Sequence, residues 1–114
     1  MEREIKFRAW NKTQNRMVTF GDSRVHGVVT NQFLFSHYKN LMQYIGNKDK
    51  NGVEIYEGDI LKASYSGSSQ PPYLSVVKWD ETECAFTFGN APMWTWEDIE
   101  VVGNVHENPN LLNN

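Results

Sequence analysis

Several features that would place this chain in a familiar class are missing. Its 114 residues include one cysteine, Cys84, so no internal disulfide is possible. No apolar run approaches the roughly 20 residues that cross a bilayer, and the first residues lack the basic-then-apolar pattern of a signal peptide. These absences predict a cytoplasmic protein without membrane contact. We expect Cys84 to be a small apolar core residue, because Glu81 and Glu83 beside it disfavour a reactive thiolate.

Positive charge is also scarce. The chain has 11 Lys and Arg against 14 Asp and Glu, for a net charge of −3. General electrostatic binding of nucleic acid needs an excess of cations, so the balance argues against it without excluding a local basic patch. The 39% hydrophobic content suffices for one globular domain spanning residues 1–114. Within it we expect an N-terminal hairpin portion at about 1–45 and a barrel portion at about 53–107.

Motifs for catalysis, metals or cofactors are absent as well. The three histidines are far apart and follow no metal-binding pattern, and the glycines form no phosphate loop. Glu54, Glu57 and Asp59 are close in sequence, as a metal site or an acid/base pair would require. The simpler interpretation is that Asp59 bonds the turn backbone while the glutamates are solvated. We therefore predict no enzyme, no catalytic residue, no metal and no cofactor.

Residues 41–62 organise the rest of the chain. They predict a strand, a tight turn at 48–52, a short extended arm, and then a new strand. Asp49 is placed to accept hydrogen bonds from the following backbone, and Asn51-Gly52 is a strong hairpin signal. Gly58, followed by Asp59, marks a sharp bend, a bulge or a close backbone approach.

Alternation of apolar and polar residues predicts strands elsewhere. Residues 4–10 and 16–20 form a hairpin, and further strands cover 59–65, 73–79, 84–89 and 100–106, with 93–96 extended and one helical turn at 97–98. Short strands are expected within residues 25–38, although a helix at 32–44 fits the spacing too, and the tail from 108 is expected to fray. Together these predict a mainly β fold, a small SH3-like barrel with the N-terminal β-hairpin packed on it or extending its sheet. The expected core is Phe7, Ile55, Ile60, Val77, Trp79, Phe86, Phe88, Val101 and Val105.

Two surfaces are candidates for binding. The first is a nucleic-acid face on the N-terminal hairpin, where basic residues are interleaved with an aromatic; its members are Lys6, Arg8, Trp10, Lys12 and Arg16. The alternative there is a charged solvent face. The second surface holds Trp94 and Trp96, two residues apart and so on one side of an extended segment. We expect at least one of them, with Met93 or Pro92 beside it, to lie in a contact with a second copy or a partner. The alternative is that both cap the barrel.

Four blocks of the sequence resemble the YopX family of small phage and prophage proteins. They are residues 3–10, 41–62, 76–81 and 101–109, in the family's order. His106 departs from the resemblance, since the family usually has an aromatic there, and residues 21–35 and 63–73 match no family motif. The family has no established activity, so the resemblance supplies no catalytic residues.

These observations leave three functional classes open. The first is a non-catalytic phage or prophage accessory protein that binds proteins or self-assembles, with a homo-oligomer or another phage or host protein as partner. The second is a nucleic-acid-binding accessory factor, supported only by the hairpin and by fold analogy. The third is an enzyme with Glu57 and Asp59 as its candidate residues.

Overall fold

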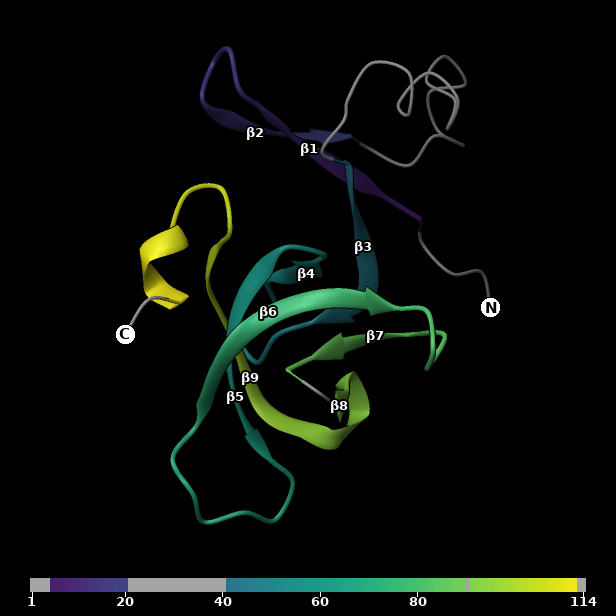
Figure 1. Cartoon of the computed structure of the whole chain (residues 1–114), viewed down its shortest axis with the longest axis vertical. Coiled ribbons are helices and arrows are strands. Elements are labelled where there is room, and N and C mark those ends of the chain that lie inside the picture. Colours follow the sequence, from purple (N-terminus) through teal and green to yellow (C-terminus); the bar gives the residue numbers. More distant parts are fainter. Residues whose placement is uncertain (1–4, 21–40, 90, 113–114) are drawn as a thin grey trace.

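A computed structural model describes residues 5–20, 41–89 and 91–112, which form two β-sheets (Figure 1). The strands are β1 (Phe7–Asn11), β2 (Arg16–Phe20), β3 (Leu41–Lys48), β4 (Glu54–Tyr56), β5 (Asp59–Tyr65), β6 (Tyr73–Asp80), β7 (Ala85–Phe88), β8 (Ala91–Pro92) and β9 (Trp96–Asn104). Two short 3-10 helices, η1 (Met93–Thr95) and η2 (Pro109–Leu112), complete the described elements. The strands expected within residues 25–38 lie outside the described residues.

The first sheet contains the predicted N-terminal hairpin. Its strand order is β2-β1-β3-β4. β1 and β2 pair antiparallel from Phe7↔Phe20 to Asn11↔Arg16, and β1 then pairs with β3 on its other side. The hairpin therefore extends the sheet of the central stretch. Residues 41–44 are in β3, so the helix alternative is wrong for them, and its remaining residues lie outside the described part.

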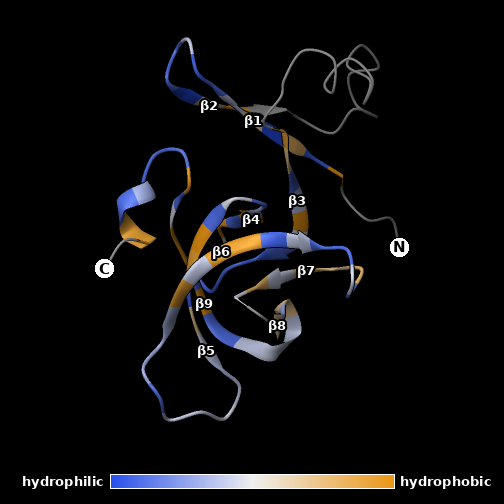
Figure 2. Ribbon diagram, viewed as in Figure 1, coloured by the Kyte–Doolittle hydropathy of each residue, from blue (hydrophilic) through white to orange (hydrophobic). Residues whose placement is uncertain are grey.

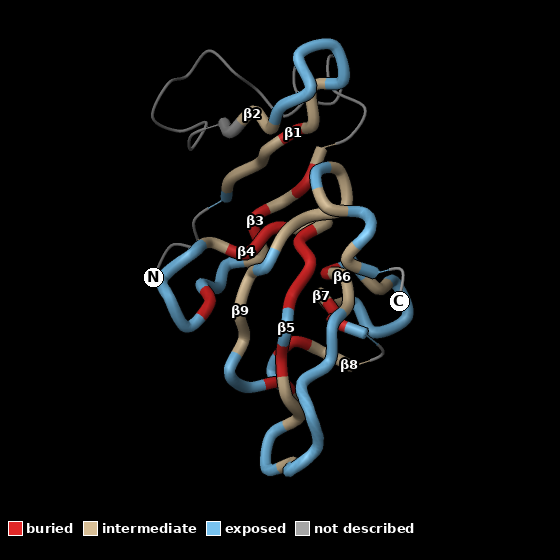
Figure 3. Tube along the Cα trace, turned by 90° about the vertical axis from the view of Figure 1, so that its left-hand side faces the viewer, coloured by how far each residue is buried: buried red, intermediate tan, exposed pale blue. Residues whose placement is uncertain are grey.

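The second sheet is a curled half-barrel with the order β8-β7-β6-β5-β9. β6 is long and strongly bent, so its first half pairs with β5 and its second half with β7 (Figure 1). β5 lies between β6 and β9 and contains more buried residues than any other described strand, coloured red in Figure 3. The predicted mainly β, barrel-like fold class is confirmed.

The core is built mainly from apolar positions of this curled sheet, whose strands carry orange, hydrophobic segments in Figure 2. Its buried members are Ile55, Leu61, Ala63, Val77, Phe88, Met93 and Trp96. Two core predictions were wrong. Trp79 is 48% exposed, because it lies near the end of β6 where the sheet has passed the core. Cys84 is exposed in the β6–β7 turn at φ 52°, where the chain reverses before β7 begins.

The segment after β8 also differs from expectation. Residues 93–95 form η1 instead of an extended segment, and Glu97 and Asp98 belong to β9 instead of a helical turn. After β9, the described part of the tail, to Leu112, is ordered. It contains η2, and the Asn108 N–H donates a hydrogen bond to the Asn104 carbonyl (2.8 Å). Of the described residues, no helix has the length and apolar character needed to span a membrane.

Candidate binding surfaces

The β3–β4 turn is organised by Asp49, as the sequence predicts. One carboxylate oxygen accepts the N–H groups of Asn51 (2.8 Å) and Val53 (2.9 Å). The other accepts the N–H of Val101 in β9 (2.9 Å), which alternation could not reveal. Gly52 has φ +83°, the left-handed conformation that the turn requires. The turn of the first sheet is thereby fixed onto the edge of the barrel.

The charge of Asp49 is stabilised by these contacts. Burial alone would raise its pKa, but the hydrogen bonds from Val101, Val53 and Asn51 outweigh burial, and the pKa of Asp49 is lowered. The carboxylate is therefore a structural anion, and both of its oxygens already accept backbone hydrogen bonds.

Gly58 and Asp59 form the junction between the two sheets. Gly58 has φ +85°, and a Cβ there would lie 2.9 Å from Met42 Sδ, so the predicted close approach is confirmed. Asp59 is 1% exposed; it accepts the Tyr56 N–H (2.8 Å) and forms an ion pair with Arg8 Nη2 (2.6 Å). Burial raises the pKa of Asp59, although the Arg8 guanidinium and the Tyr56 N–H oppose that change.

The two glutamates of the acidic cluster also bind other residues of the chain, so the expectation that they are solvated was wrong. Glu54 forms an ion pair with Lys6, and Glu57 accepts the Gln43 N–H (2.8 Å). Burial and the nearby Glu54 raise the pKa of Tyr56 to about 12. Across the described ranges, no three His, Cys, Asp or Glu side chains are grouped so as to hold a metal ion. The Glu54 and Glu57 contacts therefore bind β4 and the turn after it to Lys6 and β3, while the Asp59 contacts join the first sheet to β5 of the barrel.

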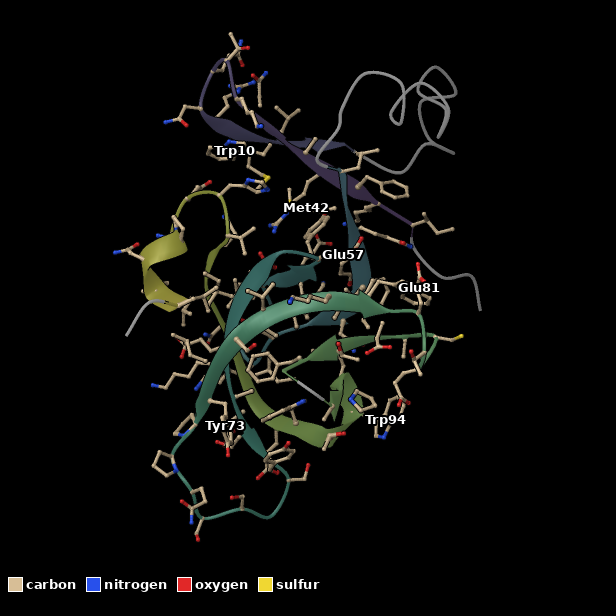
Figure 4. All side chains as sticks on the ribbon, in the orientation of Figure 1. Trp10, Met42, Glu57, Tyr73, Glu81 and Trp94 are labelled. Atoms are coloured by element: carbon tan, nitrogen blue, oxygen red, sulfur yellow. The ribbon has the colours of Figure 1, made fainter. Side chains whose placement is uncertain are left out.

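The five residues of the proposed nucleic-acid face do not form one surface. Lys6 and Arg8 turn toward Glu54 and Asp59, with only 18% and 11% of their side chains exposed. Trp10 stacks on His106 at a ring separation of 5.3 Å, between the first sheet and the segment after β9 (Figure 4). Lys12 and Arg16 are exposed. Two of the four cations are thus neutralised by partners that lie about 50 residues away in the sequence.

The three residues of the proposed protein interface also separate. Trp94 is 77% exposed and points away from the barrel (Figure 4), whereas Trp96 and Met93 are 7% exposed and belong to the core. The prediction that one tryptophan reaches the surface is confirmed. The prediction that both share a face was wrong, because η1 rotates the chain between them.

An aromatic notch, which we define by Tyr65, Tyr73, Phe88 and Trp96, opens at the end of the half-barrel. It encloses about 410 Å³ and is also lined by Leu74, Ser75 and Gly89. Tyr65 stacks on Trp96 at 4.1 Å, and Tyr73 meets both rings edge-on at 5.7 Å. Sequence reasoning missed this site. The available signal was the pair of tyrosines at positions 65 and 73, which flank the breaker-rich loop and so stand at facing strand ends.

A second hollow, of about 530 Å³, lies between β3 and the β6–β7 hairpin. Ile45 contributes from β3, and Trp79 and Phe86 contribute from the hairpin with their rings in an edge-to-face contact at 5.1 Å. Cys84 lies at its margin and donates its S–H to the Glu81 carbonyl (3.4 Å). This hollow is a second partly apolar recess, near the end of β6 opposite to the end that lines the notch.

The fold and these surfaces define a small two-sheet β protein in which ion pairs join the sheets and aromatic side chains remain accessible. The sequence matches the YopX family, described as YopX protein, over residues 6–113, and the chain belongs to that family. It is also similar to a solved structure, the crystal structure of protein EF1440 from Enterococcus faecalis. That similarity has 25% identity and a TM-score of 0.62 and covers 96% of this chain and 98% of the other. No curated protein matches the sequence.

Proposed function

We propose that this protein is a non-catalytic protein-interaction module that uses Trp94 as an anchor. The observation that carries the proposal is the 77% exposure of Trp94 beside two buried neighbours. Tryptophan is enriched at protein interfaces, where its burial removes about 150–250 Å² from water. Because Met93 and Trp96 are fixed in the core, the exposed indole is presented on a rigid support. A preorganised anchor loses less entropy on binding than a mobile one.

The hydrogen bonds and ion pairs of the acidic residues support the non-catalytic part of the proposal. Asp59 is bonded to Arg8 and to the Tyr56 N–H, and Glu57 is bonded to the Gln43 N–H. A general acid or base needs access to a substrate proton, which these contacts obstruct. Their geometry is that of a structural network between two sheets.

The first partner to test is a second copy of the chain. Sedimentation velocity of the wild type from low to high micromolar concentration is expected to show association, and the Trp94→Ser variant is expected to remain monomeric. Leu112→Ser is the matched control, because Leu112 is an exposed apolar residue in η2, well separated from Trp94 in the sequence. A wild type that stays monomeric at high micromolar concentration would rule out self-association and leave a foreign protein as the partner.

Membership of the YopX family further supports a phage or prophage accessory role in the cytoplasm of a bacterial host. Sequencing of the flanking genes tests this part directly. Neighbouring genes for phage replication or structural proteins are the expected result, and a chromosomal operon without phage genes would contradict it.

A further inference from the structure

The half-barrel has a stretch of backbone edge that is open on one side. β7 pairs with β6 from Asp80↔Ala85 to Val77↔Phe88, where β7 ends. β5 pairs with the earlier half of β6, from Ile60↔Val76 to Ala63↔Tyr73. Within the described residues, positions 73–76 of β6 therefore have a paired strand on only one side. An unpaired edge offers main-chain donors and acceptors to an added strand.

The direction of these groups follows from one hydrogen bond. The Val77 carbonyl accepts the Gly58 N–H (3.0 Å), so it points to the side of β6 on which β5 lies. Main-chain groups alternate sides along a strand, as the ladder pattern of antiparallel pairs requires. The N–H and C=O groups of Leu74 and Val76 therefore point to the open side, where β7 would pair if it continued.

The aromatic notch lies beside this edge. Ser75 is opposite the buried Leu61 and Tyr73 is opposite the buried Ala63, so both side chains are on the concave face that the notch occupies. Cross-strand neighbours share a face of the sheet. A residue added opposite Ser75 would consequently direct its side chain into the notch, next to Tyr73, Phe88 and Trp96.

We propose that an extended segment of a partner protein adds to the open edge of β6 as an extra strand. Leu74 and Val76 exchange main-chain hydrogen bonds with the segment, and the notch receives one uncharged aromatic or aliphatic side chain. Among the described residues that line the notch, none is Lys, Arg, Asp or Glu, so a charged side chain would lose hydration there without gaining an ionic partner from them. Its volume of about 410 Å³ is within the range of small ligand pockets. This inference rests on the proposed function as an interaction module but uses residues other than Trp94.

The probe is a phage-displayed library of random 12-residue peptides, selected on the wild-type protein and followed by synthesis of the strongest binder. Leu74→Pro removes the Leu74 N–H, a donor that faces the open edge and does not bond to β5. Proline is tolerated at such edge positions of a sheet. Its matched control, Leu74→Thr, keeps the N–H. We expect selected peptides to carry uncharged apolar residues at alternate positions, and Leu74→Pro to bind about tenfold more weakly. Leu74→Thr should bind like the wild type.

Amide hydrogen exchange supplies a second readout on the unmodified chain. The Leu74 and Val76 amides are expected to exchange quickly in the free protein and to become protected with the peptide bound. If Leu74→Pro does not fold, Ser75→Trp replaces it, because the larger side chain fills the notch and leaves the edge amides in place. Loss of binding in Ser75→Trp is then the supporting result.

Failure of this inference is distinguishable from failure of the proposed function. Selection of no binder, equal binding by Leu74→Pro, or protection elsewhere in the chain would overturn the added strand. If the wild type self-associates and Leu74→Pro does not, the occupant of the edge is a second copy of the chain, and the proposal of a foreign segment is overturned. Trp94→Ser should bind the peptide normally. If Trp94→Ser alone abolishes peptide binding, the notch proposal fails while the anchor role of Trp94 stands.

Discussion

Asp49 is the residue with the clearest energetic role. One carboxylate holds the β3–β4 turn through Asn51 and Val53 and holds β9 through Val101. Hydrogen bonds to a charged group contribute about 1.5–3 kcal/mol each in mutational series, and an orphaned donor adds to the loss. A single side chain therefore couples a local turn to a long-range contact between the sheets.

Stability should depend on pH through Asp49. Its folded pKa is lowered from 3.8, so its contribution is complete above that value and is lost as the pH falls through the folded pKa. At pH 7 we expect Asp49→Asn to lower the free energy of unfolding by at least about 2 kcal/mol. The difference from wild type should shrink below about pH 4. Urea titrations at several pH values measure this, and a pH-independent difference would show that the charge of Asp49 is not what matters.

At Gly58 the structure gives two separate reasons why a side chain is disfavoured. Its φ is +85°, and a Cβ would meet Met42 Sδ at 2.9 Å. Gly67 provides a matched control, because it has φ +78° with no atom within 4 Å of a Cβ. Both Gly→Ala variants should lose about 1 kcal/mol through the backbone conformation, and Gly58→Ala should lose more through the contact. Equal losses in urea unfolding would remove the close approach as a factor.

At the scale of elements, the contact between β1 and the barrel junction depends on the Arg8–Asp59 pair. Both side chains are nearly inaccessible, and the guanidinium also lies over the Tyr56 ring at 4.7 Å. Breaking a buried pair leaves an uncompensated charge, which typically destabilises by about 3–5 kcal/mol. Removing both partners avoids that penalty.

A double-mutant cycle tests this junction. Arg8→Met and Asp59→Asn are each expected to destabilise by several kcal/mol, and the double variant by clearly less than their sum. Lys12→Met is the control for loss of a hairpin cation, because Lys12 is exposed. Additive losses would mean that Arg8 and Asp59 act independently, and the proposed link between β1 and the barrel would be wrong.

The second link between elements is the stack of Trp10 in β1 on His106, which follows β9. Burial and the positive charges of Arg8 and Lys12 lower the pKa of His106, against the effect of Glu107. The unfolded chain therefore takes up a proton first, and stability should fall as the pH drops below about 6.5.

His106→Phe should keep the stack and remove its titration. The variant is expected to lose less stability than the wild type between pH 6.5 and the lowered folded pKa of His106, while the other two histidines contribute equally to both proteins. Thermal unfolding across that range provides the measurement. Parallel pH profiles for the two proteins would contradict the assignment of a neutral His106 in the stack.

Local signals in the sequence predicted most of the described elements. Alternation gave β2 and β5 with their observed bounds, and Asn51-Gly52 located the central turn. The sites were harder to predict because their partners are remote in the chain. Lys6 and Arg8 have the alternation of a solvent face, and only the fold brings Glu54 and Asp59 to them. Trp94 and Trp96 were placed on one face because an extended segment was assumed, and a single 3-10 turn separates them.

At the scale of the whole molecule, a few charged groups are buried where the two sheets meet, while some aromatic side chains of the barrel are accessible. Ion pairs and carboxylate–amide bonds hold the two sheets together around Gly58 and Asp59. Trp94 and the aromatic notch lie on the barrel, away from that junction (Figure 4, where Trp94 and Tyr73 are labelled). This arrangement is the basis of our proposal that the barrel presents apolar contact points to another chain.

Comparative affinity capture tests the anchor role of Trp94 most directly. Tagged wild type and tagged Trp94→Ser serve as baits in nuclease-treated lysates of the organism that encodes the protein, each with an untagged copy co-expressed so that self-association also registers. We expect that at least one protein, the untagged copy or a foreign one, is retained by the wild type and lost from Trp94→Ser, while Leu112→Ser retains it. The same set of proteins on all three baits would contradict it.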